Sequence, residues 1–424
     1  MSFMNHEAAG LDARAVEAAR ARTRWSLVAG VSLGSTGHIA AITVSTIVAQ
    51  EVLGVEALAG APGSAVVLGA AVGAIILSWI MARRGRRFGL VWGYLISVVG
   101  ALVATASVLT VSFPLLLIGM LLIGFGNSSN QLSRYAAADL VAPDRRAVAI
   151  GIVVWGATVG AVLGPFLVPI AGRFATSVGL PELAGPFLVP IAFVGAAAVL
   201  QFVLLRPDPF ALAHHTTVRA EGDPDAAPLR TILGRPTVLA AIVALVAGQF
   251  TMVLVMTWTP LHLTNHNHGL EIVGLVISGH VAGMFALAPL SGRIAQRLGS
   301  VATIFLGAAI LAFASGLAAL APDTDATVLF VALFLLGFGW NLGFVAGSTM
   351  LSSGLELAER TRIQGLADAV IWSTSAIASL GSGVIVSVAG YTGLGILGAA
   401  LVAIPVWILL QRRRAIALAA GLQG

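Results

Sequence analysis

The stretch "LLIGFG" at residues 121–126 returns as "FLLGFG" at residues 334–339. Two more pairs keep nearly the same offset. "WIMARRGRR" from Trp79 matches "RIAQRLGSV" from Arg293, and "VWGATVGAVLG" ending at Gly164 matches "IWSTSAIASLG" ending at Gly381. Three pairs in one order indicate that a large unit was duplicated, because self-similarity at a fixed period is typical of repeated architectures.

The composition indicates a membrane protein. Hydrophobic residues make up 58% of the 424 residues and charged residues 10%, and the mean hydropathy is +0.98. So little polar surface cannot coat a soluble globule of this length. Apolar runs long enough to cross about 30 Å of hydrocarbon recur from end to end. We therefore predict an all-α polytopic membrane protein.

The apolar runs and their polar interruptions predict about twelve transmembrane helices in two six-helix halves. The longest interruption, at residues 206–236, is rich in Pro, Asp and His and is expected to be a linker. The expected segments are a polar N-terminal segment 1–24, halves at 25–205 and 237–411, and a tail at 412–424. The predicted spans lie near 25–50, 64–82, 89–110, 114–138, 147–170, 186–205, 237–262, 270–292, 301–320, 326–352, 364–389 and 393–411.

The basic residues predict the orientation. All 23 Lys and Arg positions are Arg, and with these spans the arginines of the connecting segments fall on one side, Arg173 excepted. The positive-inside rule then places both termini in the cytoplasm and the chain in the inner membrane. The net positive charge reflects this topology and anionic lipid headgroups, so no nucleic-acid partner is expected.

With these features, the chain resembles the major facilitator superfamily over nearly its whole length. "SWIMARRGRR" lies where that family has its loop signature, and "GIVVWGATVGAVLGP" resembles the antiporter motif of drug exporters. The resemblance implies a transporter, expected to be monomeric. A drug:proton antiporter is one alternative, although Ala82 and Gln296 replace the signature aspartates and Met120 replaces the arginine of proton-coupled exporters.

Two short motifs suggest a soft metal site. "MVLVM" places Met252 and Met256 four residues apart, and "HVAGM" places His280 and Met284 at the same spacing on the next predicted helix. Residues four apart share a helix face. Three thioethers and one imidazole favour Cu(I). Methionine also fills gaps in apolar cores, so the spacing alone leaves simple packing open.

The same two motifs are similar to those of the CcoA-like copper importers, which carry them on helices seven and eight in this order. The resemblance implies that Met252, Met256, His280 and Met284 bind copper as the transported substrate. A riboflavin-transporting branch looks very similar, so riboflavin or another small organic solute stays open as the alternative. The chain has 0 Cys, which excludes thiolate ligands and disulfides, and no cofactor is expected.

Other polar residues in or near the spans are candidate functional groups. The loop after the helix of Met252 has three imidazoles that are expected to capture a metal or merely to be solvated, namely His262, His266 and His268. Candidate pathway residues are His38, Asn127, Asn130, Gln131, Gln249, Trp340 and Asn341. Four tryptophans could stack on a flavin, namely Trp155, Trp258, Trp340 and Trp372.

Charged residues near the ends of three predicted helices are expected to cluster as a gate, namely Arg134, Asp139, Glu359, Arg362 and Asp368. Asp368 lies deepest and is therefore the candidate proton site. The sequence contains no nucleotide loop, HExxH pair or nucleophile elbow in a plausible setting, so we expect no enzyme activity.

Overall fold

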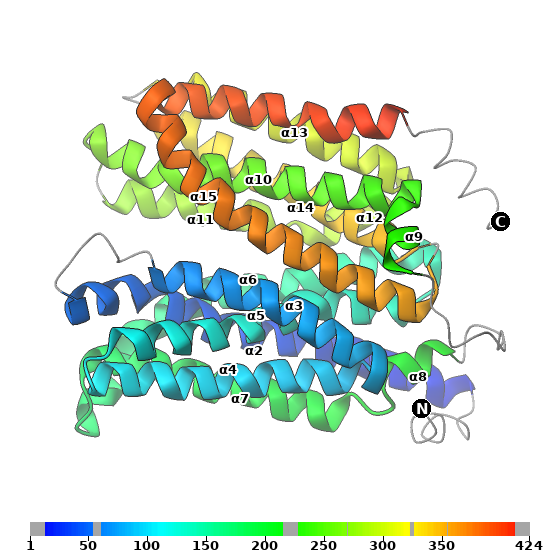
Figure 1. Cartoon of the computed structure of the whole chain (residues 1–424), viewed down its shortest axis with the longest axis horizontal. Helices are drawn as coiled ribbons and strands as arrows, with labels where there is room; N and C mark the ends of the chain where they lie inside the picture. The colour runs from blue at the N-terminus through cyan, green and yellow to red at the C-terminus, as the bar shows by residue number, and fades with distance from the viewer. Residues whose placement is uncertain are drawn as a thin grey trace. The chain divides into compact units, whose positions relative to one another are not determined.

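The computed structural model describes residues 13–53, 61–214, 228–268, 270–322, 326–353 and 355–411 (Figure 1). All regular elements in these ranges are helices, and 11 of them are long and apolar enough to cross a membrane. The prediction of an all-α polytopic protein is confirmed. The expected tail 412–424 and parts of the expected segments 1–24 and 206–236 lie outside the described residues.

The last two predicted spans lie in one continuous helical stretch, and this accounts for the difference between 11 and about twelve. Helix α15 (Leu357–Leu401) contains Gly390 with φ 68° and ψ −177°. Glycine adopts this backbone conformation readily, whereas residues with a Cβ atom do not. The ribbon of α15 reverses direction between its orange and red parts (Figure 1). Gly390 therefore makes the connection between two membrane helices.

The chain folds into two compact units, of which unit 1 contains Met1–Ala142, Gly156–Asp225 and Gln364–Trp372. Helix α5 lies at its centre and packs against α2, α3 and α4. A Cβ atom at Gly69 of α3 would overlap the carbonyl oxygen of Leu121 on α5, so glycine is what permits these two backbones to touch. The helices of unit 1 are α2 (Ala13–Leu53), α3 (Ala61–Arg84), α4 (Arg86–Leu109), α5 (Phe113–Asp139), α7 (Gly185–Leu204), α8 (Pro209–His214) and the greater part of α6 (Arg146–Ser177).

Unit 2 contains Pro143–Trp155, Ala226–Ile363 and Ser373–Gly424. Helix α14 lies at its centre, against α10, α11 and α13. The span predicted at 270–292 is two helices, α11 and α12, because the proline of Ala288–Pro289 begins a new helix. The helices of unit 2 are α9 (Leu229–Gly234), α10 (Pro236–Asn265), α11 (Leu270–Phe285), α12 (Ala288–Leu298), α13 (Ser300–Ala319), α14 (Ala326–Leu351) and the rest of α15.

The close contact between α11 and α14 depends on Gly283, where a Cβ atom would overlap the carbonyl oxygen of Phe334. We expect Gly283→Val to destabilise the protein by about 1–3 kcal/mol, because the backbones must separate. Thermal unfolding in detergent would measure the loss. The control is Gly274→Val on the same helix, where a Cβ atom would meet nothing within 4 Å. Equal unfolding temperatures for the two variants would contradict this account of the helix contact.

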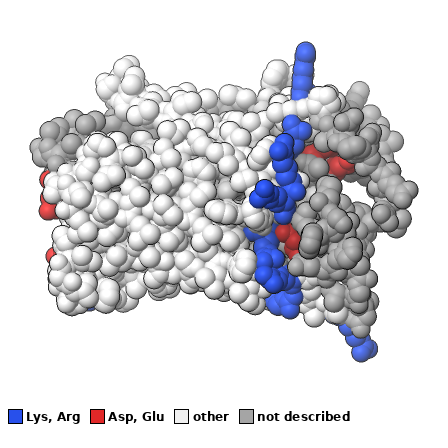
Figure 2. Space-filling view, turned by 60° about the horizontal axis from the view of Figure 1, so that its bottom comes forward, with Lys and Arg blue, Asp and Glu red and all other residues white. Residues whose placement is uncertain are grey.

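The surface has the pattern expected of a membrane protein. Large apolar side chains are widely exposed, among them Val388 at 84% and Leu380 at 76%. The face in Figure 2 is mostly uncharged, with a narrow band of blue basic residues and a few red acidic residues beside the band and at the opposite edge. Arg83 and Arg84 at the end of α3 are among the exposed arginines. Such a surface suits contact with lipid along its length and with headgroups at the arginines.

Candidate functional site

A buried polar network in unit 2 joins three of its helices. The indole Nε1–H of Trp340 on α14 donates to Oε1 of Gln249 on α10 at 2.7 Å. The amide Nε2 of Gln249 donates to Oγ of Ser375 on α15 at 2.8 Å. All three side chains are buried. Buried polar groups in an apolar medium are held where they can bond one another, so this network fixes the Trp340 ring.

Two phenylalanines surround the same tryptophan. The Trp340 ring stacks on Phe344, with 4.6 Å between centroids and 19° between planes. It meets Phe285 edge-on at 6.0 Å and 80°. An indole held by a hydrogen bond at its edge and by aromatic contacts offers a rigid apolar surface beside an amide. Trp340 and Gln249, both predicted to line a pathway, are therefore brought into direct contact.

The histidine predicted to bind copper is directed towards α14. His280 is fully buried, and its Nδ1 lies 2.9 Å from the carbonyl oxygen of Leu333. Since a carbonyl can only accept, Nδ1 carries the proton, and the lone pair is on Nε2. Nε2 is buried without a hydrogen-bond partner in the described structure. This tautomer is the one that a histidine uses when it binds a metal through Nε2.

The three methionines of the predicted copper set lie on the helices expected for them. Met252 is buried on α10, and Met256 and Met284 are partly buried. The side-chain amide of Asn341 donates to the backbone carbonyl of Met284 at 2.7 Å, so it braces α11 against α14. The main contacts of α11 are with α14. His280 on α11 and Asn341 on α14 therefore each bond a backbone carbonyl of the other helix.

The loop histidines pack against one another and against a tyrosine. His262 stacks on Tyr391 with centroids 4.1 Å apart, and its ring lies 4.4 Å from that of His266. Tyr391 also exchanges a 2.8 Å hydrogen bond with Thr259. Among the described residues no group of three or more His, Cys, Asp or Glu could hold a metal ion, and His268 completes no such group. Tyr391, directly after the Gly390 turn, is a neighbour of His262 that the sequence pattern did not predict.

Unit 1 contains a second buried polar network. Tyr94 donates to Oδ1 of Asn130 at 2.8 Å, and Nδ2 of Asn130 lies 3.4 Å from Oγ of Ser35. Asn127 and His38 are also buried, and Nδ1 of His38 has no partner in the part that the structure describes. Three of the predicted pathway residues are therefore buried inside unit 1, and Tyr94 and Ser35 bond one of them, Asn130, from neighbouring helices.

Four of the five residues predicted to form one charged cluster belong to three separate ion pairs. Asp368 accepts from Nη2 of Arg134 at 2.6 Å. This arginine also donates to the hydroxyl of Tyr135 at 2.9 Å and to the Gln131 backbone carbonyl at 2.5 Å. The other carboxylate oxygen of Asp368, Oδ2, is buried with no partner in the described residues. The pair is close to fully buried, so the charges neutralise each other inside unit 1.

The second pair involves Arg86, which was expected from the sequence only as part of a loop. Its Nε and Nη2 donate to Oδ2 of Asp139 at 3.0 and 2.8 Å, and Nη2 also donates to Gln364 at 2.8 Å. Asp208 accepts from the backbone N–H groups of Arg86, Arg87 and Phe210. Burial raises the pKa of the Asp208 carboxyl, and these backbone donors oppose the rise.

The third pair lies in unit 2. Arg235 donates to both carboxylate oxygens of Glu359, at 2.8 and 2.9 Å. Glu359 also closes the capping box that begins α15, together with Glu356. Arg362 is exposed and belongs to none of the ion pairs found in the described ranges. The single cluster expected from sequence is thus a set of pairs with partners distant in sequence.

These features define a polytopic helical membrane protein with buried polar networks. The family model described as the Major Facilitator Superfamily matches residues 25–272 and 263–422. The chain belongs to the major facilitator superfamily, and it is a transporter and not an enzyme.

The most similar relatives include two from Bacillus subtilis (strain 168). The chain is 35% identical to the uncharacterized MFS-type transporter YdeG, with 91% of each chain covered. It is 36% identical to the uncharacterized MFS-type transporter YddS, over 92% of this chain and 91% of that one. It is also 31% identical to the riboflavin transporter RfnT of Brucella anthropi, over 85% of this chain and 88% of that one.

Solved structures show the same fold at low identity. The proton:xylose symporter XylE superposes with a TM-score of 0.73 at 14% identity, covering 93% of this chain and 96% of XylE. The human organic anion transporter MFSD10 gives a TM-score of 0.71 at 17% identity, covering 92% and 99%. The major facilitator fold predicted from the sequence is confirmed.

Proposed function

We propose that the protein is a secondary transporter of a small organic solute with a planar aromatic ring system, and that riboflavin is the first such solute to test. The observation that carries the proposal is the Trp340–Gln249 pair, in which an aromatic surface adjoins a buried amide. A flavin needs both a stacking surface and amide-type hydrogen bonds. The similarity to the riboflavin transporter RfnT supports this choice of solute.

Transport would follow the alternating-access scheme that duplicated halves permit, in which a site near the midplane opens to each side in turn. Trp340, Gln249 and Ser375 are hydrogen-bonded to one another. A flavin would insert between Trp340 and Gln249 by accepting from the indole N–H through a carbonyl and donating to Oε1 through an N–H, so no polar group would be left unpaired. Asp368, whose Oδ2 has no hydrogen-bond partner among the described residues, is the group we propose for proton uptake, should transport be coupled to protons.

The direct test is uptake of radiolabelled riboflavin by cells that lack their own riboflavin transporter. Cells expressing the protein should accumulate the label faster than cells with an empty vector, and unlabelled riboflavin should compete. Accumulation no faster than in the vector control, at equal membrane protein level, would exclude riboflavin as the solute.

Copper is a second candidate because of one observation, namely that Nε2 of buried His280 has no hydrogen-bond partner in the described part of the chain. The proposal for this ion is that Nε2 binds Cu(I) together with Met252, Met256 and Met284. Met252→Leu with Met256→Leu keeps the volume but removes two thioethers, so radiocopper accumulation should be lost while protein level is kept. Unchanged accumulation would assign these sulfurs to packing. His262, His266 and His268 would then have no metal to collect.

We also propose that both termini face the cytoplasm of the inner membrane and that the chain acts as a monomer. The asymmetry of the arginines supports the orientation.

Drug:proton antiport is less favoured, because Met120 is fully buried and apolar at the position of the exporter arginine. The charged pairs of Arg134 with Asp368, Arg86 with Asp139 and Arg235 with Glu359 are proposed to stabilise one conformation of the transporter.

A further inference from the structure

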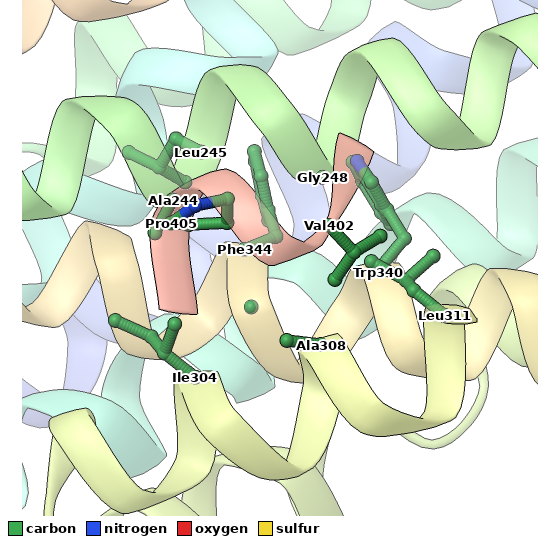
Figure 3. Close-up of a pocket in the computed structure, with 11 residues that line it drawn as sticks. Ala244, Leu245, Gly248, Ile304, Ala308, Leu311, Trp340, Phe344, Val402 and Pro405 are labelled. Carbon is green, nitrogen blue, oxygen red and sulfur yellow. The ribbon is translucent and has the colours of Figure 1, made fainter. Parts of the chain in front are cut away.

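An apolar cavity lies within unit 2, where side chains of four helical segments converge (Figure 3). It has about 340 Å³ of empty space, part of which is open to the surroundings. Its lining residues are Ala244, Leu245 and Gly248 of α10, Ile304, Ala308 and Leu311 of α13, Trp340, Gly343 and Phe344 of α14, and Val402 and Pro405 at and beyond the end of α15.

Glycines account for the cavity on the α14 side. One turn away, Gly339 makes a tight contact, because a Cβ atom there would lie 2.9 Å from the backbone nitrogen of Leu311 on α13. At Gly343 a Cβ atom would meet nothing within 4 Å, and at Gly248 it would meet only Leu311, at 3.8 Å. The helices therefore leave unfilled space in the direction in which the side chains of Gly343 and Gly248 are missing.

A break in the last membrane helix accounts for the opposite wall. Helix α15 ends at Leu401, Val402 is a turn, and the chain is helical again from 403 to 411. Pro405 has no N–H and cannot bond the carbonyl of Leu401, so the helix cannot continue regularly there. Val402 and Pro405 are both buried and line the cavity.

The lining has no side-chain donor or acceptor free for a polar ligand. Its only polar side-chain atom is Nε1 of Trp340, and that atom already donates to Gln249. A cavity with such a lining does not hold water stably. All lining residues lie in segments apolar enough to span a membrane. Beside them in sequence, Leu306 and Ile404 are exposed at 38% and 48%, as expected of lipid-facing positions.

We propose that this cavity binds the acyl chain of a bilayer phospholipid. A hydrocarbon chain needs only van der Waals contact and burial of apolar surface, which this lining supplies. The surrounding medium provides that chain at high concentration. Trp340 forms one wall of the cavity, and its N–H is hydrogen-bonded to Gln249. A bound acyl chain would therefore contact the apolar ring of a residue that belongs to the polar network. The proposal does not depend on which solute is transported.

The test is quenching of Trp340 fluorescence by brominated lipid. In a variant with every other tryptophan replaced by Phe, the full-length protein is reconstituted into vesicles of phosphatidylcholine brominated along one acyl chain. Trp340 is only 5% exposed, so strong quenching requires an acyl chain close to the ring. We expect strong quenching, and we expect Gly343→Leu, which fills the cavity, to remove most of it.

The matched control is Gly316→Leu on α13, where a Cβ atom also meets nothing within 4 Å but which does not line the cavity. It should leave the quenching unchanged. Equal quenching in the Gly343→Leu and Gly316→Leu variants would overturn the proposal, and so would weak quenching before any glycine is replaced.

A second measurement covers the case in which the single-tryptophan variant does not fold. The unmodified protein is reconstituted with phosphatidylcholine that carries a photoactivatable diazirine in its acyl chain, and the crosslinked peptides are identified by mass spectrometry. Crosslinks at lining residues of α13 and α14 should appear and should be lost in Gly343→Leu but not in Gly316→Leu. Labelling confined to exposed residues would overturn the proposal.

Discussion

Replacement of Trp340 by alanine should reduce riboflavin uptake at least about tenfold, equivalent to about 1.4 kcal/mol of lost interaction. The change removes the ring that stacks on Phe344 and the N–H that donates to Gln249. Initial uptake rates at several riboflavin concentrations, corrected for protein level, would measure the effect.

Two further variants separate the parts of this site. Trp407→Ala is the control, because Trp407 lies in the same unit but is 62% exposed, and it should leave uptake unchanged. Trp340→Phe keeps an aromatic ring but leaves Oε1 of Gln249 without its donor, and should therefore have an intermediate effect. Equal uptake by the Trp340→Ala and Trp407→Ala variants would remove Trp340 from the substrate site.

Replacement of Arg86 by leucine should destabilise the protein by about 3–5 kcal/mol, because it leaves a buried charge without its partner. Arg86 is 0% exposed and donates twice to Asp139. Thermal unfolding in detergent and yield of folded protein would both fall. Arg84→Leu makes the same change of charge at an exposed position nearby and should change stability little.

A double variant tests whether the pairing of charges is the cause. Replacing Arg86 and Asp139 together by leucine removes both charges, and apolar substitution of a whole buried pair is often close to neutral. Arg86→Leu, Asp139→Leu should therefore recover much of the stability lost in Arg86→Leu. If the double variant recovered none of the lost stability, the remaining side-chain contact of Arg86, with Gln364, would be the larger contribution.

The membrane helices could be predicted from the sequence because hydrocarbon thickness sets a length that apolar runs must reach. The span expected at 114–138 is α5 at Phe113–Asp139, and that at 326–352 is α14 at Ala326–Leu351. The division of the span 270–292 was not predicted, although Pro289 was visible in the sequence. Proline begins a helix as readily as it ends one, so its effect depends on the packing around it.

The partners of the polar residues could not be predicted in the same way. Gln249 and Trp340 were expected to face a pathway, but the bond between them joins residues 91 apart in sequence. The charged residues were expected in one cluster, whereas Asp139 pairs with Arg86 and Glu359 with Arg235. Hydropathy indicates which residues cost free energy when they enter the membrane. Which partner offsets that cost depends on how the helices pack.

The apolar cavity was beyond sequence reasoning for a different reason. Gly339 and Gly343 are four residues apart on one helix, and the pattern treats them alike. The structure gives them different surroundings, because a Cβ atom at Gly339 would lie 2.9 Å from the backbone nitrogen of Leu311, whereas one at Gly343 would meet nothing within 4 Å. An empty space is a property of several helices together, and no residue type marks it.

The pair of Arg134 and Asp368 has a consequence for how the protein is made. The two residues are 234 positions apart, so the ribosome synthesises the arginine long before the aspartate. A charged residue within a membrane helix is costly unless it is paired. During translation α5 must therefore tolerate an unmatched positive charge until the first part of α15 has been inserted. Asp368, in the last third of the chain, thus neutralises the charge of Arg134, which lies in the first third and enters the membrane earlier.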